Sequence, residues 1–261
     1  MWLRIATAAL TLALAPIQSF ATPRNCGNYP LPDEGVSKEE RIKALFERGA
    51  DCIRQGNLAQ TIATFSEVIG LDPKNVDAYS NRGSAYIQSG QFELGLADFS
   101  HVIRLDPEFV QAWYNRGTAF IAIKQYDPGI ADLTEVIRRK PDFARAYCNR
   151  ALGYMGKSDY EKALADLDAG IKIDPQLPLC YYARGDLYFG GAEYQKAVAD
   201  LTMALQLKPG NAVALATRGE AHERLGERDK ALADFKAAAA ISPTSKKIQD
   251  GIKRLSKESN G

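Results

Sequence analysis

The sequence is poor in the residues that most often carry chemistry. Its 261 residues contain only two histidines and four cysteines, with no CxxC pair and no closely spaced set of histidine and cysteine. Histidine titrates near neutral pH and is the commonest metal ligand, so its scarcity argues against a metal centre and against histidine-based catalysis. Gly-rich phosphate loops and the GxSxG and HExxH motifs are absent as well. We expect a protein that is not an enzyme and that has neither a metal nor a cofactor.

The chain also lacks a net charge of either sign. Lysine and arginine total 33, while aspartate and glutamate total 32, which gives a formal net charge of +1 at pH 7. A nearly neutral chain has no long-range attraction for polyanions or for an anionic membrane surface. Nucleic acid is therefore not expected as a partner.

Only the N-terminus carries a long apolar run. The run follows Arg4, is interrupted by Pro16, and ends before Ser19 and Ala21, which supply the small residues that signal peptidase recognises. About 13 apolar residues are too few to cross a membrane, which needs about 20. We interpret residues 1–21 as a secretory signal peptide cleaved after Ala21, with an uncleaved anchor as the alternative. The mature protein is then exported, to the periplasm or alternatively as a secreted protein, and has no membrane contact.

Proline recurs at an unbroken spacing of 34 residues, which marks an internal repeat. The prolines are Pro73, Pro107, Pro141, Pro175, Pro209 and Pro243. When each proline is counted as position 32, positions 8 and 20 are small, and positions 4, 11 and 24 are mostly bulky at the spacing of one α-helical face. Proline ends the second helix because it removes a backbone donor and restricts the preceding residue. Each repeat therefore predicts a helix A, a turn and a helix B.

The pattern resembles the tetratricopeptide repeat family, in which positions 8, 20 and 27 are small, positions 4, 11 and 24 are aromatic, and position 32 is proline. The resemblance implies an all-α fold, a right-handed α-solenoid of six helix-turn-helix repeats. The repeats are 42–75, 76–109, 110–143, 144–177, 178–211 and 212–245. One mild departure is Gly170, which is smaller than usual at position 27.

Flanking segments complete the predicted domain organisation. Residues 22–37 form a proline-rich linker, and residues 38–245 hold the six repeats, which open at a capping box from Ser37 to Glu40. Residues 246–257 form an amphipathic C-terminal helix that caps the apolar end of the last repeat.

The four cysteines would be able to pair in an oxidising compartment. Cys26 can reach back to Cys52 and pin the linker to the first repeat, or Cys52 can be a small apolar residue on its helix. The sequence leaves both interpretations open. Cys148 and Cys180 are expected to be apolar fillers on helices.

Arginine occupies position 7 in all six repeats, where the family usually has an aliphatic residue, and aspartate occupies position 23 in five. A buried unpaired charge is costly, so the matching positions predict a ladder of ion pairs between helices A and B. The predicted ladder consists of Arg82, Asp98, Arg116, Asp132, Arg150, Asp166, Arg184, Asp200, Arg218 and Asp234. The pairs lie either within a repeat or between neighbours, and both schemes leave one arginine unpaired. The alternative is an arginine row that binds an acidic ligand.

In the tetratricopeptide repeat family helix A lines the concave face, and positions 5, 6 and 12 point into its groove. Position 6 is Asn81, Asn115 and Asn149 in three successive repeats, and family members use such an asparagine row to bond the backbone of an extended peptide. The apolar groove residues at positions 5 and 12 are Phe46, Tyr114, Tyr182, Ile53, Ile87, Ile121, Met155 and Phe189. Alternatively, the asparagines only suit a half-exposed helix face and neighbouring helices cover position 12.

The resemblance implies a non-enzymatic scaffold that binds an extended segment of another protein in its concave groove. The alternative is an assembly factor or accessory subunit of a cell-envelope complex that acts through its outer face or by self-association. The sequence leaves the partner protein, the pathway and the oligomeric state open.

Overall fold

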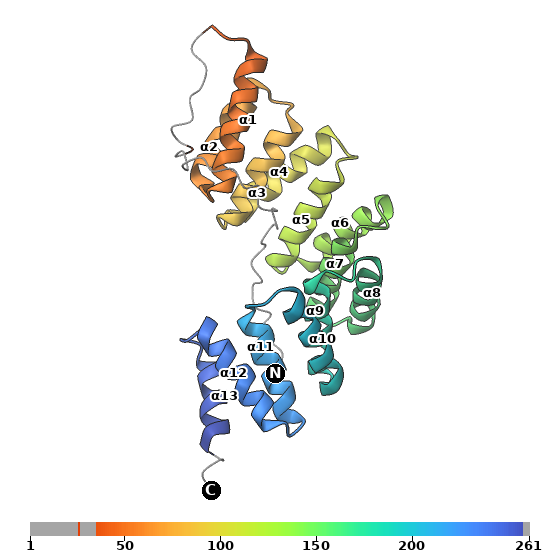
Figure 1. The fold of residues 1–261 in the computed structure, drawn as a ribbon. Coiled ribbons are helices and arrows are strands. Elements are labelled where there is room, and N and C mark those ends of the chain that lie inside the picture. Colours follow the sequence, from red (N-terminus) through yellow and green to blue (C-terminus); the bar gives the residue numbers. More distant parts are fainter. Residues whose placement is uncertain (1–25, 27–34, 258–261) are drawn as a thin grey trace. The chain divides into compact units, whose positions relative to one another are not determined.

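The computed structural model describes Cys26 and residues 35–257, and these residues form thirteen α-helices and no strand (Figure 1). The helices are α1 (Lys38–Arg54), α2 (Leu58–Leu71), α3 (Val76–Gln88), α4 (Phe92–Leu105), α5 (Val110–Ala122), α6 (Tyr126–Arg139), α7 (Ala144–Gly156), α8 (Tyr160–Ile173), α9 (Pro178–Gly190), α10 (Tyr194–Leu207), α11 (Ala212–Arg224), α12 (Arg228–Ile241) and α13 (Lys246–Lys257). The all-α expectation is confirmed, with one pair of helices for each 34-residue repeat. The predicted signal peptide and most of the predicted linker lie outside the described residues.

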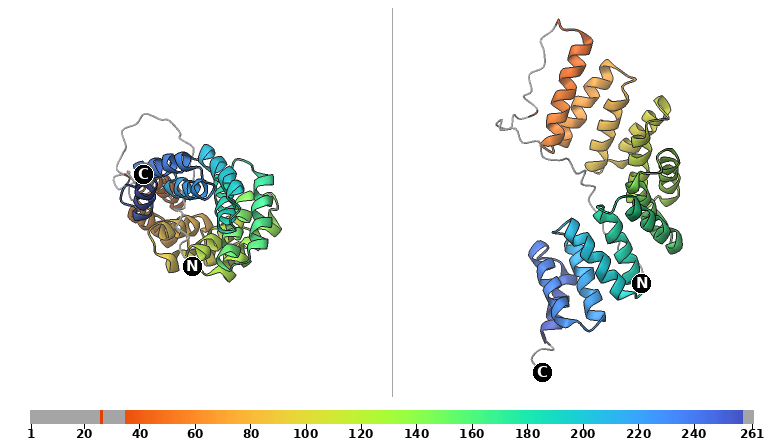
Figure 2. Two further views of the ribbon diagram at one scale, coloured as in Figure 1. Left: turned by 90° about the horizontal axis from the view of Figure 1, so that it is seen from below. Right: turned by 45° about the vertical axis from the view of Figure 1, so that its right-hand side comes forward.

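The chain divides into two units, residues 1–125 and residues 126–261. The described helices of the first unit are α1 to α5, and those of the second are α6 to α13. Within each unit every helix packs against the next one along the chain, as Figure 2 shows. This consecutive helix-on-helix stacking is the arrangement of an α-solenoid, in which each repeat contacts mainly its neighbours.

A capping box opens the first helix as the sequence predicted. The hydroxyl oxygen of Ser37 accepts a hydrogen bond from the backbone N–H of Glu40 at 3.2 Å, and the Glu40 carboxylate accepts one from the backbone N–H of Ser37 at 2.9 Å. The bond from the Ser37 backbone N–H, together with a second one from the Ser37 hydroxyl, holds the pKa of Glu40 below its usual value. The two backbone bonds also satisfy donors that the first helical turn leaves unpaired.

Small residues allow the two helices of a hairpin to approach closely. In the second repeat a Cβ atom on Gly95 would lie only 2.8 Å from the backbone oxygen of Gly83 on the facing helix. Around these contacts the bulky position 24 side chains are at most 1% exposed, namely Phe65, Phe99, Leu133, Leu167, Leu201 and Phe235. Position 24 is therefore the centre of each repeat's core.

The turn between helix A and helix B contains one residue with a positive φ. Glycine fills this place in three repeats, at Gly56, Gly90 and Gly226. In three others it is Lys124, Ser158 and Ala192, at φ of 63°, 62° and 61°. A left-handed residue with a side chain costs about 1–2 kcal/mol. In these three repeats the hairpin turn therefore forms despite the local preference for glycine.

The amphipathic C-terminal segment forms α13 and covers the last hairpin. Ile248 and Leu255 are each 4% exposed and belong to the buried cluster that contains Phe235. A Cβ atom on Gly251 would lie 2.8 Å from the Phe235 ring, so glycine lets α13 approach that ring. The apolar end of the last repeat is thereby withdrawn from water.

Candidate functional site

The arginines at position 7 form two-pronged ion pairs with aspartate inside their own repeats. Arg82 donates from Nε and Nη2 to the two carboxylate oxygens of Asp98, at 2.9 and 2.8 Å. The same geometry recurs in Arg150–Asp166, Arg184–Asp200 and Arg218–Asp234, with distances of 2.6 to 2.8 Å. The pairing with Asp98 also raises the pKa of Arg82 above its usual value. Each such pair clamps helix A to helix B.

Each of these arginines also reaches the preceding repeat. Nη1 of Arg82 donates to the hydroxyl of Ser66 at 3.1 Å, and Nη1 of Arg150 donates to the hydroxyl of Thr134 at 3.0 Å. The corresponding acceptors are Ser100 for Arg116, Asp168 for Arg184 and Thr202 for Arg218. The acceptors all occupy position 25, a recurrence outside the predicted ladder. One guanidinium thus joins three helices of two repeats.

Aromatic rings enclose the guanidinium groups. The Cζ of Arg82 lies 5.4 Å from the centre of the Tyr79 ring and 5.6 Å from that of Tyr86. Arg150 and Arg184 lie between tyrosines at positions 4 and 11 in the same way. Cations at these distances from aromatic faces are stabilised. The geometry makes the row structural and weighs against its binding an acidic ligand.

The first repeat departs from the ladder because position 23 is threonine. Arg48 donates from Nε to the Thr64 hydroxyl at 3.1 Å and forms an ion pair with Glu67 on α2. The expectation that one arginine stays unpaired is therefore wrong, since Glu67 lies close enough to replace the aspartate. Arg116 and Asp132 belong to different units, whose relative placement the structure does not define.

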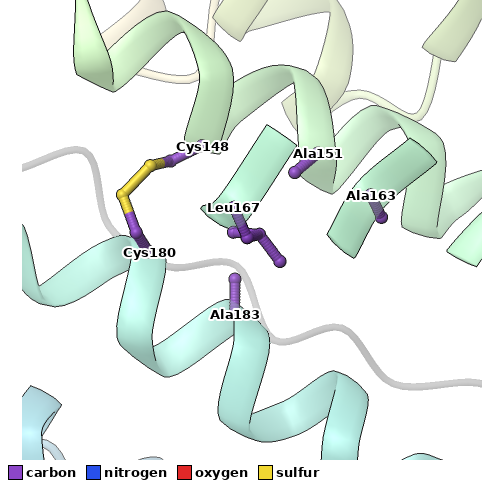
Figure 3. Packing of buried hydrophobic residues seen from close by; sticks show 6 residues of the cluster. All are labelled: Cys148, Ala151, Ala163, Leu167, Cys180 and Ala183. Carbon is purple, nitrogen blue, oxygen red and sulfur yellow. A yellow bond between two sulfur atoms is a disulfide. The ribbon is translucent and has the colours of Figure 1, made fainter. Parts of the chain in front are cut away.

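Two disulfides join the four cysteines. Cys26 is linked to Cys52 of α1, with Cα atoms 5.1 Å apart, and the backbone N–H of Cys26 donates to the Gln55 side chain at 3.2 Å. Cys148 of α7 is linked to Cys180 of α9, with Cα atoms 5.2 Å apart (Figure 3). All four cysteines are fully buried.

The expectation that Cys148 and Cys180 are separate apolar fillers is wrong. Both lie on helices A of adjacent repeats, where the stacking of α7 against α9 brings them together. Gly170 on α8 makes room for them, because a Cβ atom there would lie 2.5 Å from the Cys148 sulfur. The unusual glycine at position 27 was the signal in the sequence for this pair.

The asparagines of position 6 are partly committed to their own helices. The amide nitrogen of Asn81 donates to the backbone oxygen of Asp77 at 2.8 Å, and that of Asn149 donates to the backbone oxygen of Arg145 at 2.9 Å. Asn149 is also only 5% exposed. Asn115 accepts a bond from Gln111 through its oxygen, at 2.7 Å. Asn81 and Asn115 therefore present more amide to solvent than Asn149 does.

The apolar side chains of positions 5 and 12 are partly exposed to solvent and partly packed against the core. Phe46 contacts the buried Phe65 edge to face at 5.4 Å, and Ile87 packs over Gly95 of the facing helix. Met155, Tyr182 and Phe189 pack against buried clusters, Tyr114 and Ile121 are half-buried, and Ile53 is 36% exposed. Neighbouring helices thus cover part of the predicted pockets.

Carboxylates on the helix A face of the second unit were not among the predicted site residues. Glu220 of α11 forms an ion pair with Lys247 of α13 at 2.8 Å. Glu223 accepts two bonds from Arg254, each at 2.6 Å, which lower the pKa of its carboxyl. Asp186 of α9 is half-buried, and its burial raises its pKa.

Neither a metal site nor a membrane helix emerges in the part of the chain that the structure describes. Within residues 26 and 35–257, no group of three or more His, Cys, Asp or Glu side chains has the arrangement of a metal site. No helix in the same ranges combines the length and apolar character required to span a membrane.

Family models for tetratricopeptide repeats match most of the repeat region. A TPR repeat model matches residues 49–90 and 153–190, and two tetratricopeptide repeat models match residues 80–127 and 212–245. No curated protein sequence matches the chain.

Solved structures of repeat proteins share the fold. A tetratricopeptide repeat protein from Parabacteroides merdae is 24% identical, with a TM-score of 0.67 over 82% of this chain and 84% of that one. PilF from Pseudomonas aeruginosa is 18% identical, with a TM-score of 0.70 over 82% and 97%. YrrB, described as a TPR protein with an unusual peptide-binding site, is 17% identical, with a TM-score of 0.53 over 72% and 97%. These likenesses show the fold, and the family models, which together match more than half of the chain, show that the chain belongs to the tetratricopeptide repeat family.

Proposed function

We propose that this protein is a non-catalytic scaffold whose helix A faces bind an extended segment of another protein. Tetratricopeptide repeat domains bind proteins or peptides, and a repeat protein of similar fold, YrrB, is described as having a peptide-binding site. Affinity in such a scaffold is expected from several modest contacts along successive repeats.

The observation that carries the proposal is the asparagine pair of α3 and α5. Among the described residues, the Asn115 side chain forms a hydrogen bond only through its carbonyl oxygen, and the Asn81 side chain forms one only through an amide N–H. The remaining donors and acceptors match those of a peptide backbone. Because α3 and α5 contact each other in the first unit, one extended segment can reach both amides.

Peptides selected from a random displayed library on the purified protein provide the probe. A selected peptide is titrated by fluorescence anisotropy against the wild type, the Asn81→Ala/Asn115→Ala variant and the control variant Gln206→Ala. The control removes an exposed amide from helix B of the fifth repeat. We expect the asparagine variant to bind about tenfold or more weakly, since each lost hydrogen bond contributes about 0.5–1.5 kcal/mol. The control should bind like the wild type.

Far-UV circular dichroism checks that both variants keep their helicity. Equal affinity of the asparagine variant and the wild type would reject this groove assignment. Failure to select any peptide would reject the peptide-binding function itself.

Export from the cytoplasm is part of the same proposal, with the periplasm as the compartment and secretion as the alternative. It is supported by the N-terminal layout of residues 1–21 and by the two disulfides, because disulfides persist in oxidising compartments.

A second candidate function is that of an assembly factor of a cell-envelope complex that acts through helix B. It is favoured by exposed apolar residues at position 30, where Leu105, Ile173 and Ile241 are 37%, 39% and 47% exposed. PilW, which has a similar fold at 16% identity, is described as a type IV pilus biogenesis factor. Light scattering over a range of concentrations separates the candidates, because self-association through helix B raises the mass while peptide binding does not.

A further inference from the structure

Helices A of the last two repeats each carry a carboxylate at their ninth residue. On α11 this residue is Glu220, which forms an ion pair with Lys247 at 2.8 Å. Lys247 is the second residue of α13, the helix that follows the last repeat. The next helix thus supplies the counter-charge for the carboxylate of α11.

On α9 the ninth residue is Asp186, and the place equivalent to that of Lys247 holds no cation. The second residue of the next helix A, α11, is Val213, which is apolar and 44% exposed. Asp186 forms no hydrogen bond or ion pair with any of the described residues. The charged side chains that influence the pKa of Asp186 are Lys247, which lowers it, and Glu220, which raises it. These two side chains are already paired with each other.

The surroundings of Asp186 withdraw it from water. Tyr182 lies one helical turn before it and Phe189 nearly one turn after it, and both rings pack against the buried cluster that contains Leu201. Burial raises the pKa of Asp186, while burial and the nearby Asp186 raise the pKa of Tyr182. A carboxylate in such surroundings is unfavourable until a cation reaches it.

We propose that the helix A face of the second unit binds a lysine or arginine side chain of a partner segment at Asp186, with the alkyl stem of that side chain over Val213. The inference rests on the proposed function and adds the chemistry of one contact. An ionised carboxylate can only accept hydrogen bonds, so a cationic donor complements it. Lysine and arginine also carry an apolar stem that covers apolar surface. Lys247 on Glu220 is the same arrangement made within the chain.

Two variants test the contact from opposite sides. Asp186→Asn removes the charge and keeps the shape of the side chain. Val213→Lys places a cation at the second residue of α11, where it pairs with Asp186 as Lys247 pairs with Glu220. Val213→Gln is the matched control, because it lengthens the side chain without adding charge.

The probe is a peptide selected on the wild-type protein, together with copies in which each basic residue is replaced in turn by glutamine. We expect one basic position whose replacement weakens binding about tenfold or more, as loss of one charge-assisted bond does. Asp186→Asn and Val213→Lys should weaken binding of the parent peptide by a similar factor. They should not further weaken binding of the copy in which that basic residue is glutamine. Val213→Gln should bind like the wild type, and circular dichroism should show equal helicity for all variants.

The outcomes separate this inference from the proposed function. If no selected peptide binds more weakly to Asp186→Asn or Val213→Lys, the inference is overturned. The scaffold function still stands if selected peptides lose affinity in Asn81→Ala/Asn115→Ala. Selected peptides without any sensitive basic position would overturn the inference as well. A library that yields no binder would reject both.

Discussion

Replacing Gly170 with alanine tests whether the Cys148–Cys180 disulfide determines the size of position 27. The other repeats have valine or alanine there, at Val68, Val102, Val136, Ala204 and Ala238. Gly170 is buried, and it faces the Cys148–Cys180 disulfide and the backbone of α7. The perturbation is one methyl group in a site without spare volume.

The magnitude follows from the contacts that the new atom would make. A Cβ atom at residue 170 would lie 2.5 Å from the sulfur of Cys148, 3.3 Å from the backbone oxygen of Ala144 and 3.4 Å from the sulfur of Cys180. Overpacking of this kind costs about 1–3 kcal/mol. In a variant with Cys148→Ala and Cys180→Ala both sulfurs are gone. There alanine should stabilise α8 by about 1 kcal/mol, because glycine is the poorer helix former. The coupling between the sites is then about 2–4 kcal/mol.

Guanidinium unfolding followed by far-UV circular dichroism measures the four combinations. The Cys148→Ala/Cys180→Ala background itself should be less stable by about 2–4 kcal/mol, the usual stabilisation from one disulfide. Gly70→Ala is the matched control, since a Cβ atom at that helical glycine would meet nothing within 4 Å. It should stabilise both backgrounds equally. If Gly170→Ala destabilised both backgrounds to the same extent, the disulfide would not be the reason for the glycine.

Three further predictions concern the ion pairs and the N-terminus. Arg150→Ala and Asp166→Ala should each cost about 3–5 kcal/mol, and the double variant less than their sum, because each single change strands a buried charge; additive losses would contradict the pair within the repeat. Hydrogen bonding, chiefly from Arg138, lowers the pKa of Glu135 from 4.5 to about 2. Its stabilisation is therefore present above pH 4.5 and lost as the pH falls towards 2, so Glu135→Gln should lower the unfolding midpoint at neutral pH but not at about pH 2; an equal change at both pH values would contradict this cause. Protein exported by its native host should begin at Thr22 by N-terminal sequencing, and an N-terminus at residue 1 would contradict cleavage.

The sequence by itself determined the repeat, its helices and the capping box. The 34-residue spacing of proline, the small residues of positions 8 and 20 and the bulky residues of position 24 all act within one hairpin. Contacts within a hairpin follow from helical periodicity, because residues three, four and seven apart share a face. The matching arginine and aspartate of positions 7 and 23 were visible for the same reason.

Only the tertiary structure decided which residues of successive repeats contact each other. It placed the carboxylate of each described pair within the repeat and the third arginine bond between repeats, and it joined Cys148 to Cys180. It also left Asp186 without a hydrogen-bond or ion-pair partner among the described residues. These features depend on how successive hairpins are rotated and offset against each other. Local periodicity carries no information on that rotation, because the same residue pattern is compatible with several stacking geometries.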